Sequence, residues 1–198
     1  PYLVPSKIAD AEFTERRSRF IGHIFPTDTE KEALACLKRM RETYWDATHN
    51  VYAYIIRDGA TRFSDDGEPG GTAGMPVLQV LQREEIFNVT CVVTRYFGGI
   101  LLGAGGLVRA YAHSAKLALD AAGRSIKQVW TKIYLPCPYS WFERVKLEAA
   151  AFGGVIEGTD FGADVSFDLL LPQAQAEPFL ARVLDMSAGT IEGLTGDN

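Results

Sequence analysis

The chain has 198 residues, of which 47% are hydrophobic and 23% are charged, and its formal net charge is −5 at pH 7. This balance is ordinary for a globular protein and excludes a disordered, collagen-like or disulfide-rich class. Every apolar run is far shorter than the roughly 20 residues that a membrane-spanning helix requires. The first residues lack the basic and apolar regions of a signal peptide. We therefore expect a cytoplasmic globular protein with one or two domains.

The cysteines favour the same compartment. Cys36, Cys91 and Cys137 lie far apart in the chain, and no C-x-x-C pair occurs. An odd number of separated cysteines fits reduced thiols in the cytosol better than a disulfide framework or a zinc site.

The charge is unevenly distributed along the chain. Residues 1–127 hold 16 Lys and Arg against 15 Asp and Glu, whereas residues 128–198 hold 4 against 10. Nonspecific binding to nucleic acid is driven by the release of cations from phosphates, which an acidic segment does not provide. If the chain contacts nucleic acid, we expect the first two-thirds to do so.

The apolar periodicity of the first 122 residues predicts a mixture of strands and helices. In chain order we expect a bent strand or hairpin over residues 12–26, a helix to about residue 43, a strand over 50–57, a loop to residue 72, a short helix over 72–83, a strand over 89–96 and a helix over 105–122. Thr27 and Glu30 match a capping box, which predicts that the first helix begins there.

The remaining residues follow a different order. We expect a strand over 128–136, a helix that begins with a Ser140–Glu143 capping box, strands over 155–159 and 163–171, a helix over 173–185 and a short strand near 190–194. The order βαββαβ closes a four-stranded antiparallel sheet with two helices on one face. We therefore place a boundary at residues 123–127 and predict domains over 1–127 and 128–198.

Two loops could carry chemistry, and the first is acidic. It runs from Ser64 to Gly74 and places Asp65, Asp66 and Glu68 within four residues. Neighbouring carboxylates repel one another, so such a loop holds a cation, meets an arginine or faces water. Magnesium is one possible cation. Turns and a helix cap at Thr72 would also explain the same residues for backbone reasons alone.

The second loop is rich in glycine and lies between a predicted strand and a predicted helix. Its glycines are Gly98, Gly99, Gly103, Gly105 and Gly106. A strand, a glycine loop and a helix start can point free amides at an anion. The flanking Arg95 and Arg109 favour phosphate. The loop matches neither the P-loop nor the dinucleotide motif, and close packing of the helix on a sheet is the alternative explanation.

Histidine and basic clusters complete the candidates. His49 stands beside a predicted strand near Asp46, where a hydrogen-bonded structural role is more common than that of a catalytic base. Basic residues at 16–19 and at 38–41 lie close to aromatic residues. This mixture suits phosphate contact combined with base stacking, although each cluster alone is also typical of a solvated surface.

Four motifs form a long and specific combination. They are Ser-Arg-Phe-Ile at residues 18–21, Ala-Thr-His at 47–49, the acidic loop at 64–74 and the run from residue 93 to residue 111. Through them residues 12–122 resemble the YigZ/IMPACT family, and the following segment resembles the small C-terminal domain of its bacterial YigZ branch. The resemblance implies an α+β protein. Its N-terminal domain would be of the ribosomal-protein-S-five domain-2 type, with a left-handed βαβ crossover, and its C-terminal domain ferredoxin-like.

The resemblance also implies binding rather than catalysis. Eukaryotic IMPACT members restrain a translation-stress kinase by competing for its activator, and RNA or ribosome contact is the usual suggestion for the bacterial branch. No established catalytic activity accompanies the family, so we assign no catalytic residue. The family's motif residues in this chain are Arg19, His49, Asp65, Asp66, Glu68, Arg95, Gly98, Gly99, Gly103, Gly105, Gly106 and Arg109.

We therefore expect a non-enzymatic, translation-linked protein whose N-terminal domain binds RNA or the ribosome. The arginines, His49 and the glycine loop would bind the anion, and the three carboxylates would buttress the arginines or hold a magnesium ion that bridges to phosphate. Two alternatives stay open. One is a magnesium-dependent phosphotransferase or hydrolase acting on a phosphate-containing small molecule. The other is a protein–protein interaction module, with the acidic C-terminal domain docking on a basic partner.

Overall fold

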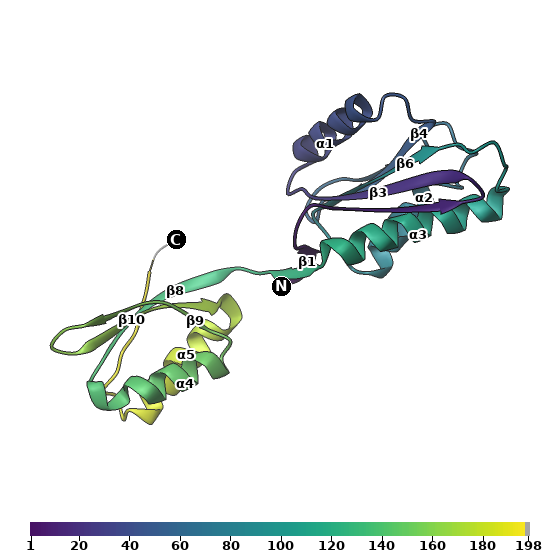
Figure 1. Cartoon of the computed structure of the whole chain (residues 1–198). Helices are drawn as coiled ribbons and strands as arrows, with labels where there is room; N and C mark the ends of the chain where they lie inside the picture. Colours follow the sequence, from purple (N-terminus) through teal and green to yellow (C-terminus); the bar gives the residue numbers. More distant parts are fainter. Residues whose placement is uncertain (197–198) are drawn as a thin grey trace. The chain divides into compact units, whose positions relative to one another are not determined.

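The computed structural model, which describes residues 1–196, separates into two compact units (Figure 1). The first unit comprises Tyr2–Lys127, and the second begins at Gln128. Helices and strands are mixed in both units, which confirms the predicted α+β class. Within residues 1–196, no helix is both long enough and apolar enough to span a membrane.

The first unit is built on a five-stranded sheet with the order β2-β3-β6-β4-β5. Its elements are β1 (Tyr2–Pro5), β2 (Ala9–Glu15), β3 (Ser18–Pro26), α1 (Glu30–Thr43), β4 (His49–Ile55), β5 (Thr61–Ser64), α2 (Gly74–Arg83), β6 (Val89–Tyr96), α3 (Ala104–Ala122) and β7 (Arg124–Lys127). Both β3 and β4 pair antiparallel with β6. They are therefore parallel to each other, with β6 inserted between them, and α1 makes the crossover that joins them.

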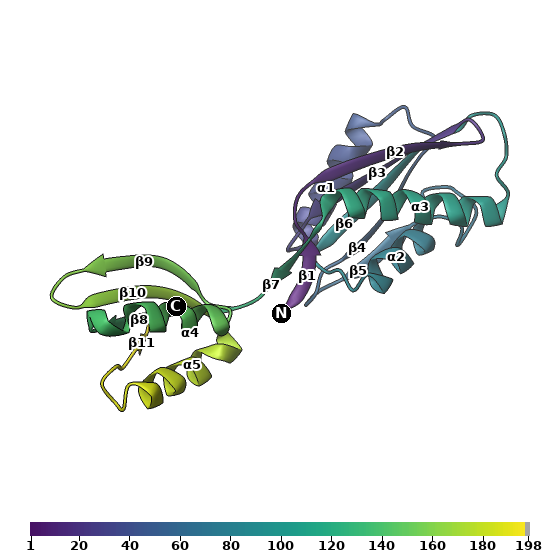
Figure 2. The ribbon, with the colours of Figure 1, turned by 60° about the horizontal axis from the view of Figure 1, so that its bottom comes forward.

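Helices cover both faces of this sheet, with α1 on one side and α2 and α3 on the other (Figure 2). Alternate residues of a strand point to opposite faces, so Phe20 packs towards α3 while Phe25 packs towards α1. The central strand β6 is buried on both faces, apart from its last residue. Gly22 lets α3 approach β3 closely, because a Cβ at this position would lie 2.5 Å from the carbonyl oxygen of Ser114.

The second unit is a four-stranded antiparallel sheet with the order β11-β8-β10-β9. Its elements are β8 (Trp130–Cys137), a single turn of 3-10 helix η1 (Tyr139–Trp141), α4 (Phe142–Ala151), β9 (Val155–Phe161), β10 (Val165–Pro172), α5 (Gln173–Met186) and β11 (Leu194–Thr195). The helices α4 and α5 pack on one face (Figure 1). Val145 of α4 and Phe179 of α5 share one buried core with Leu135 and Phe167 of the sheet. This is the ferredoxin-like arrangement that we expected.

Both predicted capping boxes are wrong in detail. The N-cap of α1 is Thr29, whose hydroxyl accepts the amide hydrogen of Glu32 at 3.2 Å. Thr27 is not available as a cap, because it is buried and its hydroxyl is hydrogen-bonded to Thr90. Ser140 lies within η1, and α4 begins after it without a side-chain cap. A turn of 3-10 helix therefore replaces the second capping box.

The strands that the sequence does not predict are short, and two of them, β5 and β7, are mostly exposed. β1 pairs with β7 as a separate two-stranded sheet, and β5 adds an edge to the main sheet. Each has four residues, and β7 is exposed throughout. Such segments carry no apolar alternation that periodicity could detect. In addition, α2 begins at Gly74, two residues later than expected.

Candidate functional site

A buried ion pair lies at the centre of the motif residues. Nη1 of Arg95, on β6, lies 2.5 Å from Oε1 of Glu68, in the loop after β5. The same oxygen accepts the hydroxyl hydrogen of Tyr111, on α3, at 2.6 Å. Nη2 of Arg95 donates to Oγ of Ser18, on β3. One carboxylate and one guanidinium thus connect the acidic loop, two strands and α3.

The two charges in this cluster are paired with each other. Burial, reinforced by the bond to Glu68, raises the pKa of Tyr111 well above its usual range, so the phenol stays protonated and donates. Arg95 is only 5% exposed, and its charge is balanced by Glu68. Glu68 therefore lies where the buttressing alternative places it, and a contact of Arg95 with phosphate stays a prediction.

The other two carboxylates of the acidic loop bind the backbone. Oδ1 of Asp65 accepts the amide hydrogens of Ala73 and Gly74 at 3.1 and 2.7 Å, and its Oδ2 accepts that of Gly71. Asp65 thus caps the start of α2. Oδ2 of Asp66 accepts the amide hydrogen of Asn50 at 2.6 Å.

Of the three carboxylates, only Glu68 contacts an arginine. Asp65 and Asp66 thus already accept backbone hydrogens. In the part of the chain that the structure describes, no three His, Cys, Asp or Glu side chains form a group that could hold a metal ion. A magnesium ion at this loop stays a prediction.

His49 is bonded to the backbone of the acidic loop. It lies opposite Arg95 in the register of β4 and β6, and its Nδ1 is 2.7 Å from the carbonyl oxygen of Asp66. A carbonyl only accepts, so Nδ1 carries a hydrogen and donates it. Nε2 lies 3.7 Å from Oε1 of Glu68, beyond hydrogen-bond distance. His49 lines a cavity, and its side chain is 19% exposed.

The cavity beside His49 has a volume of about 410 Å³ and a largely apolar wall. Phe97, Leu101, Leu102 and Leu107 supply that wall, and His49, Glu68 and Arg95 supply its polar part. At the rim, Leu101 is 79% exposed and Phe97 is 44% exposed. We call this space the His49 cavity.

The glycine loop has two kinds of glycine. Gly98 packs on the backbone of Arg17, and its amide donates to Oγ of Ser18 at 3.3 Å. Gly99 and Gly103 have φ values of 84° and 72°, which glycine adopts without strain. Gly103 is the N-cap of α3 and provides no side chain to cap it. The first-turn amides, which include those of Gly105 and Gly106, therefore have neither a partner within the helix nor a side-chain cap.

Two arginines lie at this helix start. Arg16, in the turn between β2 and β3, and Arg109, on α3, line a second cavity of about 270 Å³ together with Gly106. Nη1 of Arg16 donates to the carbonyl oxygen of Leu101 at 3.4 Å. Nη1 of Arg109 lies 3.5 Å from the point where a Cβ of residue 105 would stand. We call this group, Arg16, Arg109 and the first turn of α3, the α3 anion surface.

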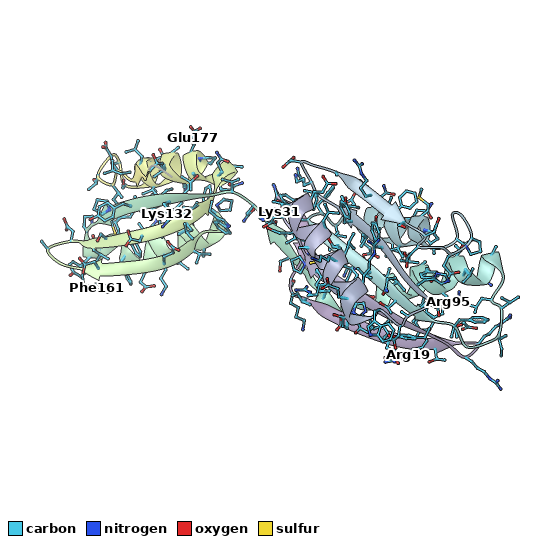
Figure 3. All side chains as sticks on the ribbon, turned by 90° about the horizontal axis from the view of Figure 1, so that it is seen from above. Arg19, Lys31, Arg95, Lys132, Phe161 and Glu177 are labelled. Atoms are coloured by element: carbon cyan, nitrogen blue, oxygen red, sulfur yellow. The ribbon has the colours of Figure 1, made fainter. Side chains whose placement is uncertain are left out.

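The structure thus brings together some of the predicted residues and separates others. Arg109, His49 and three of the five glycines, Gly103, Gly105 and Gly106, lie around the start of α3, whereas Gly98 packs on Arg17. Arg19 lies at the same end of the sheet as Arg95 (Figure 3) but on the opposite face, where it forms two 2.7 Å bonds with Glu12. Arg19 therefore does not join the α3 anion surface.

Sequence reasoning missed Arg16 and Leu101 as site residues. Arg16 belongs to the basic run that the sequence shows. The residues that lie near it, however, are determined by a hairpin turn in which Arg16 and Arg17 have φ values of 44° and 64°. The sequence did contain a signal for Leu101. It is an apolar residue within a glycine-rich loop, where no buried strand or helix is expected to cover it.

Fold and site together define a two-unit α+β protein with two arginines beside the uncapped start of α3. The chain belongs to the IMPACT family: the Impact N-terminal domain matches residues 16–119, and a domain of unknown function, DUF1949, matches residues 135–190. It is similar to the IMPACT family member YvyE of Bacillus subtilis, at 32% identity over 190 residues that cover 95% of this chain and 88% of that protein. It is also similar to YigZ of Escherichia coli, at 34% identity over 195 residues, with 96% of each chain covered.

A solved structure extends the likeness to three dimensions. A crystal structure of a hypothetical protein superposes with a TM-score of 0.63 at 34% identity, covering 100% of this chain and 98% of that one. The human protein IMPACT is 39% identical over 95 residues, which cover 46% of this chain and 30% of that protein.

Proposed function

We propose that this chain is a non-enzymatic, translation-linked protein of the cytoplasm, whose first unit binds RNA, free or on the ribosome, through the α3 anion surface. The observation that carries the proposal is the placement of Arg16 and Arg109 beside the uncapped first turn of α3. The link to translation rests on family membership, since the IMPACT resemblance implies a role in translation control.

The electrostatics of the surface favour an anion. A helix start carries a partial positive charge, and its free amides are hydrogen-bond donors. The first turn of α3 contains no acidic residue that would satisfy them. Arg109 is exposed on the same helix. Glu15 is the acidic residue that lines the second cavity.

The chemistry around the surface favours RNA over a small phosphate compound. Phe97 and Leu101 are exposed, and the carbonyl oxygen of Leu101 accepts a hydrogen bond from Arg16. Basic groups combined with exposed aromatic and apolar side chains suit a single-stranded nucleic acid, whose bases present flat apolar faces. A phosphotransferase would need carboxylates that converge on a metal ion, and Asp65 and Asp66 are instead bonded to backbone amides.

The test is the salt dependence of binding by the full chain to a fluorescent single-stranded RNA. Each phosphate contact contributes about 0.7 to the slope of log K against log salt for single strands. We expect Arg16→Ala and Arg109→Ala each to reduce that slope by about this amount. Arg62→Ala removes an exposed charge from β5, at the other edge of the sheet, and is the matched control.

Sedimentation with ribosomes over the same salt series extends the test to the larger partner. Attachment through phosphates must weaken steeply as salt rises. Absence of RNA binding at low salt, or slopes that are equal in all three variants and the parent chain, would overturn the proposal.

A further inference from the structure

We infer that the His49 cavity receives a nucleobase, so that the surface binds RNA with at least one base unstacked. The inference rests on the proposed function and assigns a ligand to the His49 cavity, which shares the first turn of α3 with the α3 anion surface. One nucleotide would occupy both sites, with its phosphate at the arginines and its base in the cavity.

The first step concerns the shape and polarity of the cavity. A base has two flat apolar faces and one hydrogen-bonding edge. The cavity matches this pattern, because leucine and phenylalanine side chains form its wall while His49 stands at its polar side. Among the residues that the structure describes, Nε2 of His49 has no hydrogen-bond partner. The edge of a base carries hydrogen-bond donors and acceptors and can supply that partner.

The second step concerns the exposed rim. Leu101 is 79% exposed and Phe97 is 44% exposed, although both line a concave site. Covering these side chains with a base would remove apolar surface from water, which is favourable. An aromatic side chain also offers a stacking face, and stacking tolerates every base because each one has a π-face.

The third step connects the cavity to the phosphate groups. Leu102 lines both the His49 cavity and the cavity that contains Arg16 and Arg109. Arg16 donates to the carbonyl oxygen of Leu101, whose side chain lines the His49 cavity. Base and phosphate sites therefore lie on two sides of one short loop. The neighbouring positive charge selects a nucleotide over an uncharged apolar group from a protein.

A base can enter this cavity only when it is free of its helix. Sequence-independent recognition of duplex RNA uses its shape and backbone, whereas single strands splay their bases onto protein side chains. The inference therefore predicts a preference for single strands, which a purely electrostatic surface would not require.

The experiment compares two oligomers with the full chain by fluorescence anisotropy. One is an eight-nucleotide oligouridylate, and the other is an abasic sugar-phosphate of the same length and charge. We expect the oligouridylate to bind about tenfold more tightly, within the range that stacking of one base provides. Leu101→Ala and Phe97→Ala should each reduce this ratio several-fold, with no change in the salt slope.

Leu34→Ala is the matched control, because Leu34 is 53% exposed but lies on α1, on the other face of the sheet. Urea unfolding of each variant verifies that the first unit stays folded. Ala104→Phe is a second variant, designed to fill the cavity mouth without removing any side chain from its wall.

The outcomes separate the two proposals. Equal affinity for both oligomers, with the salt slope intact, overturns the base site and leaves the RNA-binding surface in place. An unchanged ratio in Leu101→Ala, Phe97→Ala and Ala104→Phe overturns the base site as well. If neither oligomer binds at low salt, that result overturns both the proposed function and the base site. A free nucleoside monophosphate, titrated in parallel, shows whether one nucleotide unit is sufficient or whether a polymer is required.

Discussion

Gly98 packs directly on the backbone of Arg17, and a Cβ at residue 98 would overlap the carbonyl group of Arg17. This contact fixes the turn between β2 and β3 against the glycine loop. It therefore determines where Arg16 meets Leu101, and with it the geometry of the α3 anion surface.

The first prediction follows from this contact. Gly98→Ala forces both backbones to move, and we expect a loss of about 1–3 kcal/mol in the free energy of unfolding, as for other overpacked sites. Urea denaturation measures it. Gly70→Ala is the control, because its Cβ would meet nothing within 4 Å and its φ is not in the left-handed region. A stable Gly98→Ala variant would contradict the close packing.

The buried ion pair provides the second prediction. Glu68→Gln leaves the Arg95 guanidinium buried without a counter-charge, which costs about 3–5 kcal/mol of stability in comparable pairs. The double variant Glu68→Gln with Arg95→Met should lose less than the sum of the two single variants, because it leaves no uncompensated charge. Urea denaturation of the four proteins gives the coupling energy. Additive losses would show that the two groups do not interact.

The third prediction concerns pH. His23 is buried between Asp10 and Thr94, against the ring of Tyr44. Burial lowers its pKa below the usual 6.5, and the bond to Asp10 opposes that change. A lowered folded-state pKa means that this contribution to stability is complete above pH 6.5 and is lost as the pH falls through the folded-state pKa.

We therefore expect the free energy of unfolding to decline as the pH falls below about 6.5. Urea denaturation at several pH values checks this, and His23→Gln should flatten the decline in that window. The carboxylates Asp28, Glu84 and Asp120 have pKa values lowered from 3.8–4.5, chiefly by bonds to lysine, so their losses come at lower pH. If the free energy of unfolding of His23→Gln depended on pH as that of the parent chain does, His23 would not be the cause of the decline.

The fourth prediction tests the corrected helix caps. Thr29→Ala removes the N-cap of α1 and should destabilise the first unit by about 1 kcal/mol. Ser140→Ala removes a hydroxyl that caps no helix, so its effect should stay within about 0.5 kcal/mol. Thermal or urea unfolding distinguishes the two. The reverse order of effects would restore the capping box that the sequence suggests at Ser140.

Much of the fold could be predicted from the sequence because the long elements bury one face. In α3, Leu107, Tyr111, Ala115 and Leu119 recur at helical spacing and all are buried. The strand β6 is rich in valine and threonine, the β-branched residues that are typical of strands. The capping residue of α1 was misplaced by two positions because Thr27 and Thr29 both suit an N-cap, and only tertiary packing shows that Thr27 is buried.

The candidate site was less predictable because its charges are paired across the fold. Glu68 and Arg95 are 27 positions apart, and nothing in their spacing shows that they share one buried bond. Arg19 and Arg95 look equivalent in the sequence, yet the alternation of neighbouring strands places them on opposite faces. Arg16 and Arg109 become neighbours only through the β2–β3 turn and the start of α3.

The middle strand of the first sheet is also the last of its five strands to be synthesised. Until residues 89–96 leave the ribosome, β3 and β4 lack their common partner, and each presents an unpaired edge. A nascent chain halted before residue 89 would therefore expose two apolar edges with no native means of covering them. The order of synthesis therefore leaves both edges unpaired until β6 is complete, shortly before the glycine loop follows it in the chain.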